Sequence, residues 1–159
     1  MGHIHELYDF TASAFIVNDQ RVLLIHHKKI GKWLQPGGHI ELDEDPLQAL
    51  YREIKEETGL TKDALSIIET TQHKRSRGKK GNNKILPLPF DINVHPFNDT
   101  HKHIDLCYLL TASHDTVVNE EDKAHDIGWF TLTEIKRLTA RGLAFPDTLE
   151  LATFALKYA

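Results

Sequence analysis

One stretch, residues 38–60 (GHIELDEDPLQALYREIKEETGL), constrains the fold most tightly, because it contains signals for both ends of a helix. Asp45 has a side chain suited to capping the first turn, Pro46 suits the first helical position, and Gln48 completes a capping-box pattern. Gly59 is the residue type that most easily adopts the left-handed conformation at a helix end. The stretch therefore predicts one short helix between these signals.

The same helix carries an acidic cluster that its own electrostatics disfavour. Glu53, Glu56 and Glu57 are spaced i, i+3 and i+4, so their carboxylates repel one another in the last turns, where the helix dipole favours cations. Each unfavourable placement costs about 0.3–1 kcal/mol, and Arg52 offsets part of it. Ala49 falls on the same arc and leaves room beside the carboxylates. A hard divalent cation such as Mg2+ would compensate this crowding, and an ordinary solvated acidic face is the alternative interpretation.

A wider pattern around these glutamates resembles the Nudix box, G-x5-E-x7-R-E-U-x-E-E-x-G-U, where U is apolar. Its positions are occupied by Gly38, Glu44, Arg52, Glu53, Glu56, Glu57 and Gly59, with Ile54 and Leu60 at the apolar positions. At roughly 7% usage per residue type, seven fixed matches occur by chance about once in 10^8 start positions. The resemblance to the Nudix hydrolase family implies an α/β fold, a Nudix-type α/β/α sandwich with a mixed β-sheet, in a single domain over residues 1–159.

The family resemblance also implies roles for the matching residues. Glu56 and Glu57 would be the principal Mg2+ ligands, with Mn2+ as a substitute ion, and Glu53 would ligate a metal or orient and deprotonate the attacking water. Arg52 would hold Glu56 by an ion pair. Glu44 would support the geometry of the loop and helix. These assignments make Glu53, Arg52 and Glu44 the expected catalytic group.

A glycine pair and several histidines border this motif. In Nudix proteins the pair corresponding to Gly37 and Gly38 lets the backbone approach metal and phosphate, and the carbonyl at Gly37 is an expected metal ligand. His39 and His103 fall beside or on predicted strands, and we expect them, with Gly38, to contact the substrate. A transition-metal site at His101 and His103 is the alternative, but no third ligand at zinc-like spacing supports it.

A basic segment follows the next predicted strand. Residues 74–84 (KRSRGKKGNNK) are either a solvated run or a flexible lid whose cations meet substrate phosphates. Arg75 and Arg77 are the expected substrate contacts in the second interpretation.

An additional acidic ligand is expected outside the motif, because many family members recruit one from the loop before the penultimate strand. Glu120 and Glu121 occupy such a region, although a solvated acidic turn would look the same. Asp105 is a weaker candidate, since a carboxylate in a central strand also serves to satisfy buried polar groups.

Alternating strand and helix patterns predict an α/β or α+β arrangement. Strands are expected at residues 11–18, 21–29, 64–71, 90–95, 101–112 and 126–130, with helices at residues 131–138 and 146–158. A loop is expected at residues 31–38, and a turn at residues 96–100. Alternation in residues 101–112 places His103, Asp105 and Cys107 on one face of that strand.

Composition sets broad limits. A formal charge of −4 over 159 residues argues against a stable nucleic-acid partner but not against nucleotides. The single cysteine, Cys107, excludes an intramolecular disulfide, and no apolar run reaches transmembrane length. We therefore expect a cytoplasmic protein without a membrane partner. A homodimer is one expected state, because dimers are common in the family.

The expected activity is Mg-dependent pyrophosphohydrolysis of a nucleoside diphosphate linked to another moiety, with a small nucleotide such as a nucleoside triphosphate favoured as substrate. A nucleotide sugar or an ADP-ribose-type substrate is the alternative, although the family's downstream proline marker for ADP-ribose is absent. A non-catalytic nucleotide-sensing module, or a different metal enzyme using Cys107, would be other uses of the same fold. Retention of every glutamate of the motif favours the hydrolase.

Overall fold

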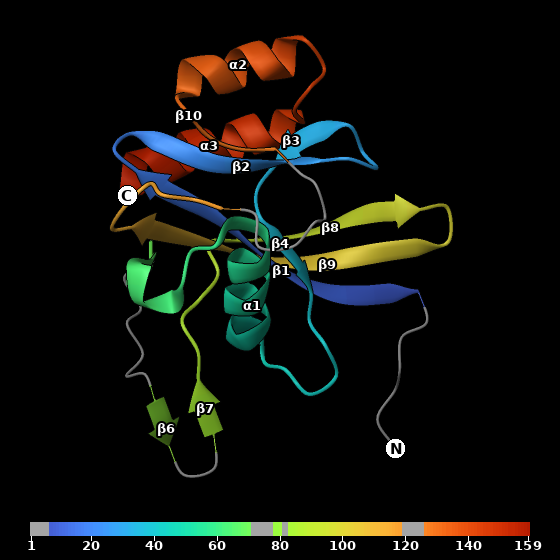
Figure 1. The fold of residues 1–159 in the computed structure, drawn as a ribbon. Helices are drawn as coiled ribbons and strands as arrows, with labels where there is room; N and C mark the ends of the chain where they lie inside the picture. Colours follow the sequence, from blue (N-terminus) through green and yellow to red (C-terminus); the bar gives the residue numbers. More distant parts are fainter. Residues whose placement is uncertain (1–6, 71–77, 81–82, 119–125) are drawn as a thin grey trace.

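A mixed β-sheet forms the centre of the protein, as a computed structural model shows (Figure 1). The structure describes residues 7–70, 78–80, 83–118 and 126–159. Within them, eight strands form this sheet: β1 (Tyr8–Asn18), β2 (Arg21–His27), β3 (Lys32–Leu34), β4 (Gly37–His39), β5 (Leu65–Ile68), β8 (Asp91–Asn98), β9 (His101–Ala112) and β10 (Ile127–Phe130). The main path runs β10-β2-β1-β9-β5, while β3 pairs with β2, β4 with β1, and β8 with β9.

The two long central strands hold the sheet together. β1 and β9 run parallel, whereas the other pairs in the sheet are antiparallel. Their register begins at Tyr8 opposite Lys102 and continues to Val17 opposite Thr111. Central β1 residues such as Phe15 are fully buried, as expected for a strand covered on both faces.

Helices cover both faces of the sheet, which confirms the expected α/β class. They are α1 (Pro46–Thr58), α2 (Leu132–Ala140) and α3 (Pro146–Tyr158), with α1 on the opposite side of the sheet from the other two (Figure 1). Leu50 and Ile54 of α1 belong to one buried cluster, whereas Ile135 of α2 and Ala152 of α3 belong to a second. In the parts of the chain that the structure describes, none of these helices is long and apolar enough to cross a membrane.

The predicted ends of α1 are confirmed. The Asp45 side chain accepts hydrogen bonds from the backbone N–H groups of Leu47 and Gln48, and the Gln48 side chain accepts one from the Asp45 backbone. Gly59 ends the helix with a φ of 72°. Ala49, which was expected to leave room beside the carboxylates, has a side chain that is fully buried in the core.

Parts of two segments predicted as irregular are strands. The loop expected at residues 31–38 contains β3 and the start of β4, whose Gly37–His39 backbone pairs with Thr11, Ala12 and Ser13 of β1. The turn expected at residues 96–100 begins later, because β8 continues through Pro96 to Asn98. Proline is compatible with an edge strand, where its nitrogen can face away from the sheet. The expected basic segment also contains a small hairpin of β6 (Gly78–Lys80) and β7 (Asn83–Ile85).

Candidate active site

Arg52 is the centre of the charged network on α1. Its Nε and Nη2 atoms donate to the two carboxylate oxygens of Glu44 at 2.7 and 2.8 Å, and its Nη1 donates to Glu53 at 2.6 Å. The predicted ion pair to Glu56 is present at 3.6 Å, longer than these contacts. Nη2 also donates to the His39 carbonyl oxygen at 3.0 Å. One guanidinium thus links the helix to the loop before it and to β4.

This network changes the acid–base behaviour of its members. The hydrogen bond from Arg52 lowers the pKa of Glu44 below its ordinary value, despite an opposing effect of burial. The same contacts raise the pKa of Arg52, chiefly through Glu44. The bidentate pair therefore keeps both groups charged at neutral pH.

The glycine pair brings β4 into close contact with the glutamates. The Gly37 backbone N–H donates to Glu57 Oε2 at 3.0 Å. A Cβ atom at Gly38 would lie 2.5 Å from the Glu53 carboxylate, so only glycine leaves that carboxylate in place. A Cβ atom at Gly37, where φ is 150°, would lie 2.5 Å from the Ala12 carbonyl oxygen. The absence of these side chains allows backbone and carboxylates to share one small region.

The donor chemistry of this region suits a hard divalent cation. Glu53, Glu56 and Glu57 supply carboxylate oxygens, the ligand type that Mg2+ prefers, and Gly37 supplies a neighbouring backbone carbonyl. The space that a Cβ atom at Gly38 would fill lies directly against one of these carboxylates. In the described residues, no group of three or more His, Cys, Asp or Glu side chains is already arranged to hold an ion. The residue types fit the cation, and binding would require rotation of the carboxylates toward a common point.

A second polar group lies on the α3 side of the sheet. The sequence did not indicate that its members contact one another. Thr11 Oγ1 and Ser13 Oγ of β1 donate to the two oxygens of Asp105 on β9, at 2.8 and 2.6 Å. Asp105 is 3% exposed, and this burial raises its pKa although the two hydroxyl groups lower it in part. Asp105 therefore satisfies buried donors, as the structural interpretation of this residue predicted.

Four histidines, His39, His95, His101 and His103, gather beside Asp105. His103 is 7% exposed, and its ring lies 4.9 Å from that of His39 and 5.3 Å from that of His95, between centroids. Burial, reinforced by the neighbouring imidazoles, lowers the pKa of His103 to about 4. Its Nε2 has no hydrogen-bond partner in the described structure, while Phe97 stacks on its ring. The structure thus brings the two predicted substrate-contact histidines together.

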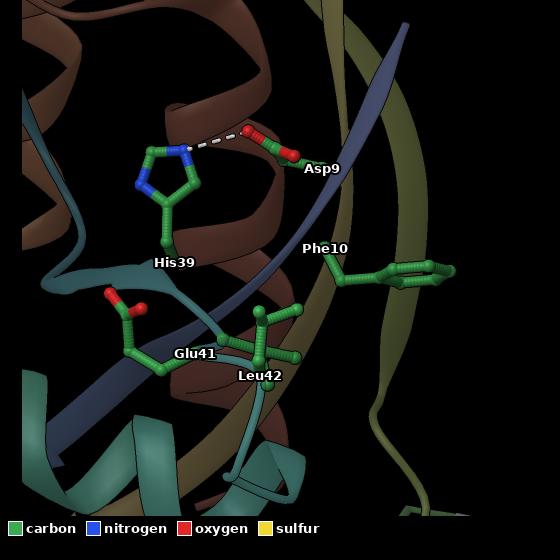
Figure 2. A pocket seen from close by; sticks show the side chains of 6 residues that line it. Asp9, Phe10, His39, Glu41 and Leu42 are labelled. Atoms are coloured by element: carbon green, nitrogen blue, oxygen red, sulfur yellow. Dashed lines mark ion pairs between the residues drawn. The ribbon is translucent and has the colours of Figure 1, made fainter. Parts of the chain in front are cut away.

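A small pocket opens beside His39 (Figure 2). Its volume is about 250 Å³, and its lining consists of Asp9, Phe10, His39, Ile40, Glu41 and Leu42. The His39 ring points toward Asp9, with Nε2 3.6 Å from the carboxylate, whereas the Phe10 ring points away from this pair (Figure 2). Gly38, the residue before His39, lies against Glu53, and because side chains alternate along a strand, His39 faces the opposite side of β4 from that carboxylate.

Four predicted site residues lie outside the described part of the chain: Arg75, Arg77, Glu120 and Glu121. Cys107 is described and fully buried, and burial raises its pKa well above the ordinary value. Such a thiol is a poor nucleophile, which argues against a reaction that uses it.

Comparisons with known proteins show which family the chain resembles. The family model described as the NUDIX domain matches residues 7–148. Among solved structures, a NUDIX-family hydrolase from Clostridium perfringens is 30% identical, with a TM-score of 0.75, and the match covers 94% of this chain and 96% of that one.

Curated relatives include a probable DHNTP pyrophosphohydrolase from Lactococcus lactis, 31% identical over 109 residues, which are 69% of this chain and 57% of that protein. An RNA pyrophosphohydrolase from Thioalkalivibrio sulfidiphilus is 42% identical over 59 residues, covering 36% of this chain and 34% of the relative. The chain therefore spans little more than half the length of the first relative and about a third of the length of the second. Together with the domain match and the glutamate-bearing α1, these likenesses show that the chain belongs to the Nudix family.

Proposed function

We propose that this protein is a Mg-dependent pyrophosphohydrolase that cleaves a phosphoanhydride bond in a nucleoside diphosphate linked to another moiety. The observation that carries the proposal is the contact between β4 and α1. There the Gly37 N–H binds Glu57, and Gly38 leaves space directly against the Glu53 carboxylate. This places a backbone without side chains, able to approach a phosphate, beside an acidic cluster able to attract a cation.

Glu56 and Glu57 would be the main Mg2+ ligands, with Glu53 and the Gly37 carbonyl completing the protein's share. When bound, the ion would neutralise phosphate charge and lower the pKa of a bound water. Glu53 would accept a proton from the attacking water as a new P–O bond forms. The bridging P–O bond would break, and its electron pair would leave with the departing phosphate. Arg52 holds Glu53 at 2.6 Å and would keep its carboxylate oriented for this step.

The substrate is proposed to be a small nucleotide, with nucleoside triphosphates ahead of nucleotide sugars and ADP-ribose-type compounds. The relatives named as DHNTP and RNA pyrophosphohydrolases support phosphoanhydride chemistry. Gly38, His39 and His103 would contact the part of the substrate that enters over β4, where the pocket beside His39 offers about 250 Å³. The imidazoles offer both hydrogen-bond donors and flat surfaces for a base.

Two further assignments fall on residues outside the described ranges. Arg75 and Arg77 would contact substrate phosphates, because guanidinium groups bind phosphate through paired hydrogen bonds. Glu120 or Glu121 would supply an additional metal ligand. Charge-removing variants at these positions, assayed with the panel below, would assign each role.

The test is release of phosphate or pyrophosphate from a panel of nucleoside triphosphates, nucleotide sugars and dinucleoside polyphosphates with Mg2+ or Mn2+. We expect wild type to turn over at least one substrate and Glu57→Gln to lose about a hundredfold or more in kcat/KM. Glu150→Gln is the matched control, since it makes the same change at an exposed residue of α3 and should retain activity. If the protein binds a nucleotide but cleaves none of the panel, the hydrolase proposal is wrong and a nucleotide-sensing module is the better interpretation.

A further inference from the structure

Strand β8 has an edge that the described structure leaves without a partner strand. β8 pairs with β9 along one side, and no other described strand pairs with it. An unpaired edge presents a row of backbone N–H and C=O groups that another strand can bind. The position of β8 at the end of its ladder therefore makes it a candidate interface.

The proline in this strand shows which backbone groups face outward. Proline in a sheet is placed with its nitrogen away from the ladder, because it has no N–H to donate. Pro96 lies opposite Lys102 of β9, so its nitrogen faces the free edge. Backbone direction repeats every second residue, and the polar backbone groups of Ile92 and Val94 therefore also face that edge.

Natural edge strands are protected by lysine, proline or bulges, and β8 has such protection at one end only. Pro96 and an irregularity before Asn98 interrupt the final residues, and no lysine or arginine occurs in the strand. The first half remains open, with Ile92 61% and Val94 57% exposed on one face. Phe10, 48% exposed, lies in the same row as Val94 across Ile104, and extends this apolar face to β1.

We propose that β8 docks antiparallel against β8 of a second copy of this chain, about a two-fold axis at Asn93. This register places Ile92 opposite Val94 of the second copy, so the outward backbone groups form hydrogen-bonded pairs and two apolar side chains meet. It also places Asp91 opposite His95 of the second copy. The strand is thus complementary to itself in backbone direction, in apolar contact and in the placement of a carboxylate opposite an imidazole.

The side chains on the other face of β8 fit the same register. Asn93 donates to Asp91 at 3.0 Å, and the His95 ring lies 2.9 Å from the Asn93 oxygen, so the three side chains form a chain along the strand. In an antiparallel second copy, these three side chains follow one another in the opposite direction. Asp91 of one copy then lies beside His95 of the other. Opposite-charge and donor–acceptor pairs directly across strands stabilise a sheet, whereas a parallel arrangement would place Asp91 near its own copy.

Sedimentation equilibrium of the full chain over a range of concentrations tests whether the dimer forms. We expect a concentration-dependent dimer for wild type, and a monomer for Val94→Lys, because a lysine on the edge resists strand pairing. Ile30→Lys makes the same change at an apolar residue that is 43% exposed beyond the far side of the sheet, and should remain dimeric. Circular dichroism of both variants controls for folding. A monomeric wild type, or a dimeric Val94→Lys, would overturn the proposal.

A cross-link tests the register itself. Asn93→Cys would face its own copy in a non-hydrogen-bonded pair, where Cα atoms are about 4.5 Å apart, within the range of a disulfide. Cys107 is fully buried and should not compete. Under mild oxidation we expect Asn93→Cys to form covalent dimers at least about tenfold faster than Asn98→Cys, which lies beyond the paired register. Equal rates for the two variants would rule out pairing about Asn93.

Discussion

The protein contains two carboxylate groups whose charges are compensated in different ways. On α1, Glu44 and Glu53 bind the Arg52 guanidinium at distances of 2.6–2.8 Å near the surface. On β9, Asp105 is buried and accepts hydrogen bonds from the neutral hydroxyls of Thr11 and Ser13. The carboxylates on α1 are stabilised by the positive charge of Arg52, whereas the Asp105 carboxyl group is stabilised by the dipoles of two hydroxyl groups.

This difference separates a group suited to chemistry from a group suited to structure. One arginine cannot neutralise all the glutamates of α1, so we expect the acidic helix to keep an affinity for a cation. The Asp105 carboxyl, whose pKa is raised by burial, instead depends on its two donors and offers 3% of its surface to solvent. Variants in the two groups should therefore give opposite outcomes for activity and stability.

The largest expected effect is on activity. Glu56→Gln should lower kcat/KM by about a hundredfold or more because it removes a proposed metal ligand. The free energy of unfolding should stay constant or rise slightly, since one repulsive charge is lost from the last turns of α1. Steady-state kinetics and urea denaturation measure the two quantities. Full activity together with lower stability would assign Glu56 to the structural group.

Asp105→Ala should show the reverse pattern. It leaves the Thr11 and Ser13 hydroxyls without their buried acceptor, and we expect the free energy of unfolding to fall by about 2–3 kcal/mol. Asp105→Asn keeps one acceptor oxygen and serves as the matched control with a smaller loss. Urea denaturation at neutral pH compares them. A stable, inactive Asp105→Ala protein would place this carboxylate in the chemistry instead.

The Arg52–Glu44 pair should show measurable coupling. Arg52→Gln, Glu44→Gln and the double variant form a cycle, and we expect a coupling free energy of about 1–2 kcal/mol for this bidentate contact. The same variants should lower kcat by about tenfold if Arg52 orients Glu53. Additive effects on unfolding would show that the two side chains do not stabilise one another.

The histidine group should make stability depend on pH. The pKa of His103 is lowered from 6.5 to about 4, so the folded protein binds a proton at this residue less readily than the unfolded chain. Its contribution is therefore complete above pH 6.5 and is lost as the pH falls toward 4. His103→Gln should flatten the decline in this interval, measured by denaturation at successive pH values. An unchanged slope would contradict the lowered pKa.

The smallest expected effect is at Cys107. Cys107→Ser should leave kcat/KM within about twofold of wild type, because a fully buried thiol of raised pKa takes no part in the chemistry. The substrate panel provides the measurement. Complete loss of activity in a folded variant would favour a reaction that uses the thiol.

The parts of this structure that depend on neighbouring residues were predictable from the sequence. The capping by Asp45 and Gln48, and the left-handed Gly59, act within one turn of the helix end. Alternation along β9 also correctly placed His103 and Asp105 on one face, since this requires only a period of two.

Contacts that depend on strand order were not predictable in the same way. Thr11 and Ser13 lie 94 and 92 residues from Asp105, and they meet it only because β1 runs parallel to β9 in one register. Arg52 contacts Glu44 across eight residues, a spacing set by the loop before α1 rather than by helical periodicity. The contact expected from the family resemblance, to Glu56 at i+4, is the weaker one, and the stronger contact to Glu44 was not predicted.

Binding of the catalytic cation by the glutamates of α1 is best tested by titrating the protein with Mn2+ and following the free ion by electron paramagnetic resonance. We expect saturable binding by wild type and by Glu150→Gln, with binding strongly weakened in the Glu56→Gln/Glu57→Gln double variant. Equal Mn2+ affinity in that double variant and in wild type would show that the cation binds elsewhere, and would contradict the proposed site.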